Sequence, residues 1–210
     1  MARLSFRCRN YTIKPLDEKE VIPSFRKTMG DYSDKELLTM FREESSRHSA
    51  FNLIVRKYQQ KIYWHIRRIV IIHDDADDVV QNTFIKAWEG LDNFREEANL
   101  YTWLYRIATN ESITFLNKKR AHLNVSLGDV EYQLSKSLEA DVYYDGDEIQ
   151  TQLQKAILTL PEKQRIVFNM KFYDDMKYED MSKVLDTSVG ALKASYHHAV
   201  KKIEEYVKEN

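Results

Sequence analysis

Residues 74–88 read Asp-Asp-Ala-Asp-Asp-Val-Val-Gln-Asn-Thr-Phe-Ile-Lys-Ala-Trp, and this stretch decides the fold. From Val80 on, apolar side chains recur at i, i+4, i+7, i+8 and i+11, which predicts one buried stripe on an α-helix. The members of that stripe are Val80, Phe84, Ala87, Trp88 and Leu91. The aspartates stand at the start of the stretch, where carboxylates cap free backbone N–H groups and favour the positive end of the helix dipole.

A polar bend at residues 92–95 separates this helix from a second one, which we expect to end at residues 118–120. Helical spacing predicts that one side of the second helix is buried. That side comprises Leu100, Trp103, Leu104, Ile107, Ala108 and Phe115. We expect the opposite side to expose Tyr101, Tyr105, Arg106 and Asn110, followed by the basic end Lys118, Lys119 and Arg120.

The composition excludes several classes of protein. The 210 residues include only 5 Gly and 3 Pro and few alternating β-branched runs, so we expect an all-α fold. The formal net charge of -1 means that DNA affinity must come from local basic surfaces or from a partner. The only cysteine is Cys8, which excludes an intrachain disulfide. No apolar run approaches the length of a membrane span, so we expect a cytoplasmic protein without membrane insertion.

The pattern along the chain predicts two helical domains. Residues 1–30 lack a helical period and form an N-terminal extension that we expect to be disordered, unless the start codon has been set too far upstream. Residues 31–120 form the first domain, which opens with a capping box at Ser33 and Glu36. Residues 121–148 are rich in Asp and Glu and predict a flexible acidic linker, and residues 149–210 form the second domain.

The second domain ends in the pattern of a helix-turn-helix. Residues 178–185 predict a short helix, Asp186 and Thr187 a turn, and Ser188 the start of a long helix. The inward positions of the long helix are Leu192, Tyr196, Ala199 and Ile203. The outward positions are Lys193, Ala194, His197, His198 and Lys201. Basic residues without any acid over residues 189–203 are typical of a helix that binds in a DNA groove.

These motifs resemble a known family. Conserved region 2 of bacterial sigma-70 family sigma factors closely resembles three segments of this chain, residues 75–88, Phe94-Arg95 and residues 102–110. The resemblance is best to the small, two-domain extracytoplasmic-function group. Residues 178–185 and 188–193 look like region 4 of the same family. The resemblance covers about residues 33–205 and implies a protein that binds core RNA polymerase, recognises the -10 and -35 promoter elements and assists promoter melting. It implies no catalysis, cofactor or metal.

The resemblance also assigns roles to residues. In the family, the first helix docks on the clamp helices of the largest polymerase subunit, which implies Asp78, Gln81 and Asn82. The second helix captures the non-template strand of the -10 element. The residues matching that role are Tyr101, Tyr105, Arg106, Asn110, Lys118, Lys119 and Arg120. The C-terminal helix reads the -35 element, with Lys193, Ala194, His197, His198 and Lys201 in that role. An anti-sigma factor is a further implied partner.

Two other functions remain open from the residues alone. Residues 74–78 have the spacing of the aspartate-rich motif that holds Mg²⁺ in prenyl-diphosphate enzymes, with Asp174 and Asp175 as a second half. His73-Asp74 is also a dipeptide used in metal phosphohydrolases, although helix capping explains the same aspartates. The other alternative is a stand-alone helix-turn-helix regulator that uses residues 1–148 for sensing or dimerisation and binds its operator without polymerase.

Overall fold

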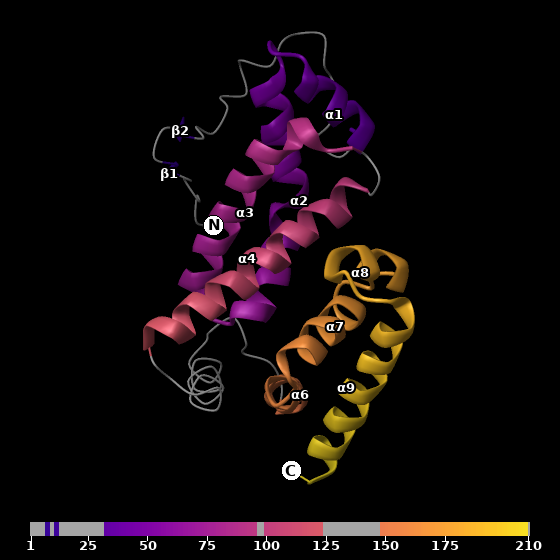
Figure 1. Cartoon of the computed structure of the whole chain (residues 1–210). Helices are drawn as coiled ribbons and strands as arrows, with labels where there is room; N and C mark the ends of the chain where they lie inside the picture. The colour runs from indigo at the N-terminus through magenta and orange to yellow at the C-terminus, as the bar shows by residue number, and fades with distance from the viewer. Residues whose placement is uncertain (1–6, 9–10, 13–31, 96–98, 124–147, 210) are drawn as a thin grey trace. The chain divides into compact units, whose positions relative to one another are not determined.

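The computed structural model of the chain describes residues 7–8, 11–12, 32–95, 99–123 and 148–209 (Figure 1). The described elements are β1 (Arg7–Cys8), β2 (Tyr11–Thr12), α1 (Asp34–Arg42), α2 (Arg47–Val70), α3 (His73–Gly90), η1 (Leu91–Asn93), α4 (Leu100–Leu123), α6 (Glu148–Leu158), α7 (Glu162–Phe172), α8 (Tyr178–Leu185) and α9 (Val189–Glu209). Every described element after residue 31 is helical, which confirms the all-α fold. The chain divides into two compact units, residues 1–57 and 58–210.

The first unit contains a short antiparallel pair, in which Arg7 lies opposite Thr12, and helix α1. The predicted capping box is present: the Ser33 hydroxyl accepts from the Glu36 N–H at 3.3 Å, and the Glu36 carboxylate accepts from the Ser33 N–H at 2.7 Å. The Lys57 ammonium binds the Asp34 carboxylate at 2.8 Å. Apart from β1 and β2, residues 1–31, and with them the predicted extension, lie outside the described residues.

The start of α3 corrects one prediction. Ile72 occupies the N-cap position and provides no side-chain cap, so the aspartates do not cap the helix by hydrogen bonds. They lie inside the helix, at the second to sixth positions after Ile72, because α3 already begins at His73. Asp74 and Asp75 are in the first turn, where their charge still favours the helix dipole. The preceding Ile71 adopts the left-handed conformation with φ 70°, and its N–H donates to the Arg67 carbonyl at 2.9 Å.

Helices α3 and α4 pack against each other in the second unit. The predicted stripe of α3 is buried except at Trp88, which is half-buried. The centroid of the Trp103 ring of α4 lies 5.2 Å from that of the Phe94 ring. A Cβ atom added at Gly90 would lie only 3.2 Å from the Trp103 ring. Gly90 therefore lets the indole approach the end of α3. Trp103 itself is half-buried rather than buried, as are Ile107 and Phe115.

Two described helices extend into the ends of the segment 121–148 that was predicted as a linker. Helix α4 continues to Leu123, three residues past Arg120, and α6 begins at Glu148. The rest of that prediction, residues 124–147, lies outside the described part of the chain.

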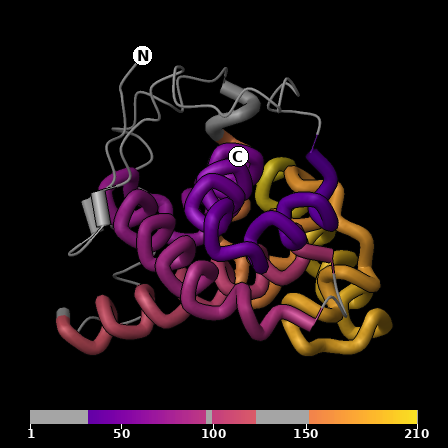
Figure 2. Tube along the Cα trace, turned by 90° about the horizontal axis from the view of Figure 1, so that it is seen from above, coloured from indigo at the N-terminus to yellow at the C-terminus, as the bar shows by residue number. Residues whose placement is uncertain are grey.

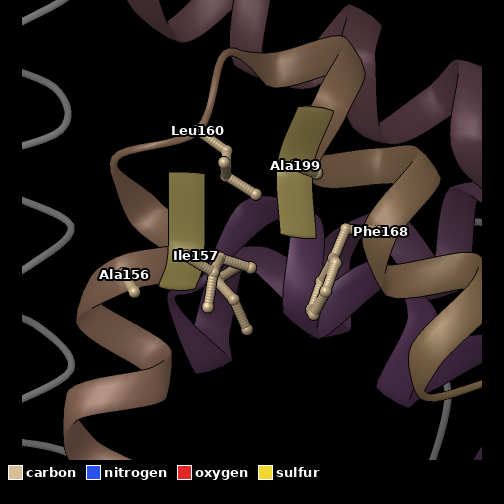
Figure 3. Close-up of a cluster of buried hydrophobic side chains, with 6 residues drawn as sticks. Ala156, Ile157, Leu160, Phe168 and Ala199 are labelled. Atoms are coloured by element: carbon tan, nitrogen blue, oxygen red, sulfur yellow. The ribbon is translucent and has the colours of Figure 1, made fainter. Parts of the chain in front are cut away.

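Helices α6 to α9 surround a small apolar core, drawn in Figure 3. Its buried members are Ala156, Ile157, Leu160, Phe168, Ala199 and Ile203. These helices, coloured orange to yellow, gather together in Figures 1 and 2. The predicted helix-turn-helix is present as α8, a turn in which Asp186 has φ 49°, and α9. The Ser188 hydroxyl accepts from the Ala191 N–H at 3.3 Å and so caps α9.

Within the described residues, no helix combines the length and the apolar character that crossing a membrane would require.

Candidate protein- and DNA-binding surfaces

The first surface lies on α3. Asp78 and Asn82 are exposed and Gln81 is half-buried, so all three predicted residues reach the surface within about one helical turn. Burial raises the pKa of the neighbouring Asp77; His73 opposes this effect, and the carboxylates of Asp74 and Asp78 add to it. The surface therefore combines negative charge with amide groups, which suits a partner that presents basic and hydrogen-bonding side chains.

The residues predicted for the -10 element lie on two different sides of α4. Tyr101 and Tyr105 are four residues apart and share one side. Arg106 and Asn110 also form an i, i+4 pair, but at 100° per residue this pair lies about 140° further around the helix. Arg106 and Asn110 are both exposed, as predicted. The helix thus presents a polar side to solvent and a tyrosine side to the protein.

The prediction that both tyrosines are exposed is wrong. Tyr105 is only 1% exposed and Tyr101 is half-buried. The Tyr105 ring centroid lies 4.3 Å from that of Tyr101 and 4.5 Å from that of His65, and its hydroxyl donates to the Lys61 carbonyl at 3.5 Å. Helix α8 also packs on α4. Tyr105 is therefore buried because elements distant in sequence cover this side of α4.

The same surroundings keep the Tyr105 phenol neutral. Burial raises the pKa of Tyr105 far above its ordinary value of 10.0, and the nearby Asp174 carboxylate raises it further. Burial likewise raises the pKa of Tyr101, and Asp174 and Asp180 contribute to that increase. The tyrosine side of α4 is therefore a low-dielectric environment that faces carboxylates.

This pKa shift predicts how alkaline pH affects stability. The unfolded chain releases the Tyr105 proton near pH 10.0, whereas the folded chain retains it. The contribution of the neutral phenol is therefore complete below that pH and is lost as the pH rises above it, by up to about 1.4 kcal/mol per pH unit. Urea unfolding from pH 9 to 11 should show a steeper loss of stability for the wild type than for Tyr105→Phe. Parallel curves for the two proteins would contradict the burial of this hydroxyl.

The three basic residues at the end of α4 also differ in how far they are exposed. Lys118 is exposed, as predicted. Lys119 forms an ion pair with Asp75 of α3, and Arg120 forms one with Glu162 of α7. Lys119 and Arg120 are consequently half-buried and occupied by carboxylates of the chain itself, so Lys118 is the member of this group that presents its charge to solvent.

The third surface, on α9, agrees with the prediction in its exposure. Lys193, Ala194, His197, His198 and Lys201 are all exposed. Lys193, His197 and Lys201 follow one another at i, i+4 and i+8, while Ala194 and His198 form a parallel row. The Lys201 ammonium lies 3.8 Å from the Glu205 carboxylate, and the two histidine ring centroids are 5.9 Å apart. This basic row therefore lies on the second helix of a helix-turn-helix, the element that enters the major groove in DNA-binding proteins of that form.

The aspartates of the metal alternative are used differently. The Asp174 carboxylate binds the side chains of His65 and Arg68, while Asp175 is 95% exposed and pairs with Lys171 at 3.0 Å. Within the described residues, no group of three or more His, Cys, Asp or Glu side chains is arranged to hold a metal ion. Side-chain geometry therefore gives no support to a magnesium site at Asp174 and Asp175.

Sequence reasoning missed a polar cluster around Asp174. His65 Nδ1 lies 3.3 Å from one carboxylate oxygen of Asp174, and Arg68 donates to the other at 2.8 Å. The partners are separated by 109 and 106 residues, so no local pattern connects them. The one available signal was the occurrence of basic residues near the end of α2, which is compatible with an ordinary solvated helix face.

Both halves of the chain match families of known proteins. Residues 54–122 match the profile of Sigma-70 region 2, and residues 150–203 match that of Sigma-70, region 4. The RNA polymerase sigma-H factor of Pseudomonas aeruginosa is 32% identical over 180 residues, covering 82% of this chain and 92% of the relative. The ECF RNA polymerase sigma-E factor of Escherichia coli K12 is 30% identical over 181 residues, covering 79% of this chain and 91% of the relative.

Solved structures share the fold. A structure of CnrH in complex with the cytosolic domain of CnrY superposes with a TM-score of 0.62 at 22% identity, covering 84% of this chain and 98% of that chain. The sigma factor RpoE of Bartonella quintana, crystallised with the anti-sigma factor NepR, gives a TM-score of 0.59 at 22% identity. The match covers 75% of this chain and 96% of that chain. The sequence matches therefore establish that this chain belongs to the sigma-70 family of RNA polymerase sigma factors, in its extracytoplasmic-function group.

Proposed function

We propose that this chain binds core RNA polymerase through the α3 surface, contacts the -10 element through α4 and reads the -35 element through α9. As a sigma factor, the protein directs RNA polymerase to specific promoters for transcription initiation. The observation that carries the assignment of surfaces is the exposed basic row of α9, which lies on the second helix of a helix-turn-helix in the segment that matches region 4.

The exposed side of α4 supports a role in holding DNA. Arg106 and Lys118 supply positive charge for phosphates, and Asn110 presents an amide that can pair with a base edge. On the tyrosine side, the half-buried Tyr101 supplies the aromatic ring on which an unpaired base stacks, because Tyr105 is buried. Lys119 and Arg120 contribute to phosphate binding once their ion pairs with Asp75 and Glu162 exchange for DNA.

Partners and location follow from the same proposal. The two structural neighbours are CnrH bound to CnrY and RpoE bound to NepR, and NepR is described as an anti-sigma factor. We extend this to the present chain and propose an anti-sigma factor as its regulator. The protein would act in the cytoplasm, where polymerase and promoters are, and would catalyse no reaction itself because the polymerase supplies the chemistry of RNA synthesis.

In vitro transcription on fragmented genomic DNA of the source bacterium tests the proposal. Core polymerase plus this chain should initiate at a defined set of start sites, preceded by shared sequences at -10 and -35, and core polymerase alone should not. The net charge of -1 gives the free chain little general attraction to DNA, so selective binding should require both proteins.

The same assay separates a sigma factor from a stand-alone regulator. A regulator binds its operator with full affinity in the absence of polymerase and does not create new start sites. If the free chain protects a specific duplex sequence and core polymerase adds no initiation, the proposed function is wrong.

A further inference from the structure

Two adjacent histidines lie in the middle of the surface proposed to bind the -35 element. His197 and His198 are both exposed on α9, and their ring centroids are 5.9 Å apart. Apart from this mutual contact, neither ring makes a hydrogen bond, ion pair or ring contact in the part of the chain that the structure describes. The ring nitrogens of both residues are therefore available to a ligand that approaches α9.

The charged side chains closest to the histidines along α9 are all cations. Exposed lysines lie one helical turn from each ring, Lys193 and Lys201 on either side of His197 and Lys202 after His198. The segment from Lys193 to Lys202 contains no Asp or Glu. Further along the helix, the Glu205 carboxylate lies 3.8 Å from the Lys201 ammonium. Protonation of the two histidines would therefore complete a continuous cationic surface.

The helices that pack against α9 do not neutralise this surface. Helices α6, α7 and α8 contact α9 on the side that buries Leu192, Ala199 and Ile203. They carry charged or titratable side chains, among them Lys155 of α6, Lys171 of α7, and Tyr178, Asp180 and Lys183 of α8. None of the charged side chains described on these three helices contacts either histidine. The negative charge that meets the imidazoles must therefore come from the ligand.

DNA supplies that negative charge at high density. The duplex carries one phosphate charge for about every 1.7 Å of its axis, and guanine presents two acceptors in the major groove. A protonated imidazole donates from both ring nitrogens, whereas a neutral imidazole donates from only one. DNA therefore binds the protonated form of such a surface better than the neutral form. By linkage, binding takes up protons and a lower pH strengthens binding.

We propose that binding of the -35 element takes up protons at His197 and His198, so that promoter recognition by this chain strengthens as the pH falls from 8 to 6. This inference rests on the proposed function, because it takes α9 as the helix that reads the -35 element. Histidine is the side chain that ordinarily changes its charge in this pH range. Lysine or arginine in the same two positions would keep a constant charge, so the response to pH is a property of the imidazoles.

His197→Gln/His198→Gln is the informative variant. Glutamine keeps a hydrogen-bond donor and an acceptor but takes up no proton. His48→Gln is the control, because His48 is also exposed but lies at the start of α2, outside the surfaces proposed to bind DNA or polymerase. His197→Lys/His198→Lys provides the comparison in which both positions stay charged at every pH used.

Binding is measured with holoenzyme assembled beforehand from core polymerase and the full-length chain. The probe is a fluorescein-labelled duplex that contains only the upstream part of a promoter mapped in the transcription assay, with its -35 element. Wild type and His48→Gln should bind it about tenfold more tightly at pH 6 than at pH 8, which corresponds to an average uptake of about half a proton. The glutamine variant should lose most of this change, and the lysine variant should bind with similar affinity at both values. An equal response in the wild type and the glutamine variant, or no response in the wild type, would overturn the proposal.

The same duplex with a scrambled -35 sequence separates this inference from the proposed function. If α9 does not read the -35 element, every variant binds both duplexes equally at both pH values, and the two proposals fall together. If the original duplex is preferred but the histidines do not change its pH response, only the present inference is wrong.

Proton uptake itself is measured by calorimetric titration of the holoenzyme with the original duplex at pH 7. Phosphate and Tris buffers differ in their heat of ionisation, so protons taken up on binding make the observed heats differ between the two buffers. The wild type should show this difference, and His197→Gln/His198→Gln should show a smaller one. Equal proton uptake by the two proteins would contradict the assignment to His197 and His198.

Discussion

Asp78→Ala/Gln81→Ala is expected to weaken binding of the chain to core RNA polymerase by at least about tenfold, equivalent to 1.4 kcal/mol. Both residues reach the surface of α3 within one turn, and Asp78 belongs to an acidic cluster with Asp74 and Asp77. Removal of the carboxylate leaves the partner's basic group without its charge pair, and truncation of the amide leaves a polar group without its hydrogen bond. Fluorescence anisotropy of the labelled chain, titrated with core enzyme, measures the change.

A suitable control removes an exposed carboxylate elsewhere. Glu44 is exposed and lies outside α3, in the connection before α2. Glu44→Ala should retain the wild-type affinity, because it changes the net charge without touching the proposed docking surface. Unchanged binding by Asp78→Ala/Gln81→Ala, with wild-type circular dichroism, would move the polymerase contact away from this part of α3.

Phe168→Ala should destabilise the α6–α9 core by about 3–5 kcal/mol. Phe168 is 3% exposed and belongs to the apolar cluster of Figure 3, where its ring also lies 5.8 Å from the Tyr196 ring of α9, measured between centroids. Truncation leaves a cavity between α7 and the helix that carries the proposed -35 residues. Weaker binding to the -35 element should therefore accompany the loss of stability, although Phe168 itself contacts no DNA in the proposal.

Phe172 provides the matched comparison on the same helix. It lies four residues after Phe168 and its ring stacks on that of Phe168 with centroids 5.1 Å apart, but it is 51% exposed. Phe172→Ala should cost about 1 kcal/mol or less, since its ring is already half in water. Urea unfolding of both variants measures the difference. Similar losses for the two would mean that Phe168 is not a central member of this core.

Helical periodicity predicted the elements well because most of these helices bury one continuous face. The α3 stripe from Val80 to Leu91 and the α9 positions Leu192, Ala199 and Ile203 are buried as expected. The capping box at Ser33 was predictable for a similar reason, because it depends on residues three positions apart. Local spacing therefore determines which elements form.

Contacts between distant segments were beyond the reach of that reasoning. Tyr105 has the spacing of an outward residue on α4, yet it is buried because His65 and α8 cover it. Lys119 and Arg120 form a basic end in sequence, but Asp75 and Glu162 pair with them in space. In each case the environment of a side chain is set by tertiary packing, which periodicity within one helix does not encode.

Association with core RNA polymerase tests the central claim most directly. The purified full-length chain, mixed with core enzyme from a related bacterium, is applied to a size-exclusion column without any anti-sigma factor. We predict that the chain elutes with the polymerase and that its own peak disappears when core enzyme is in excess. Elution of the chain at its free position, with none in the polymerase fractions, would contradict its assignment as a sigma factor that acts through core enzyme.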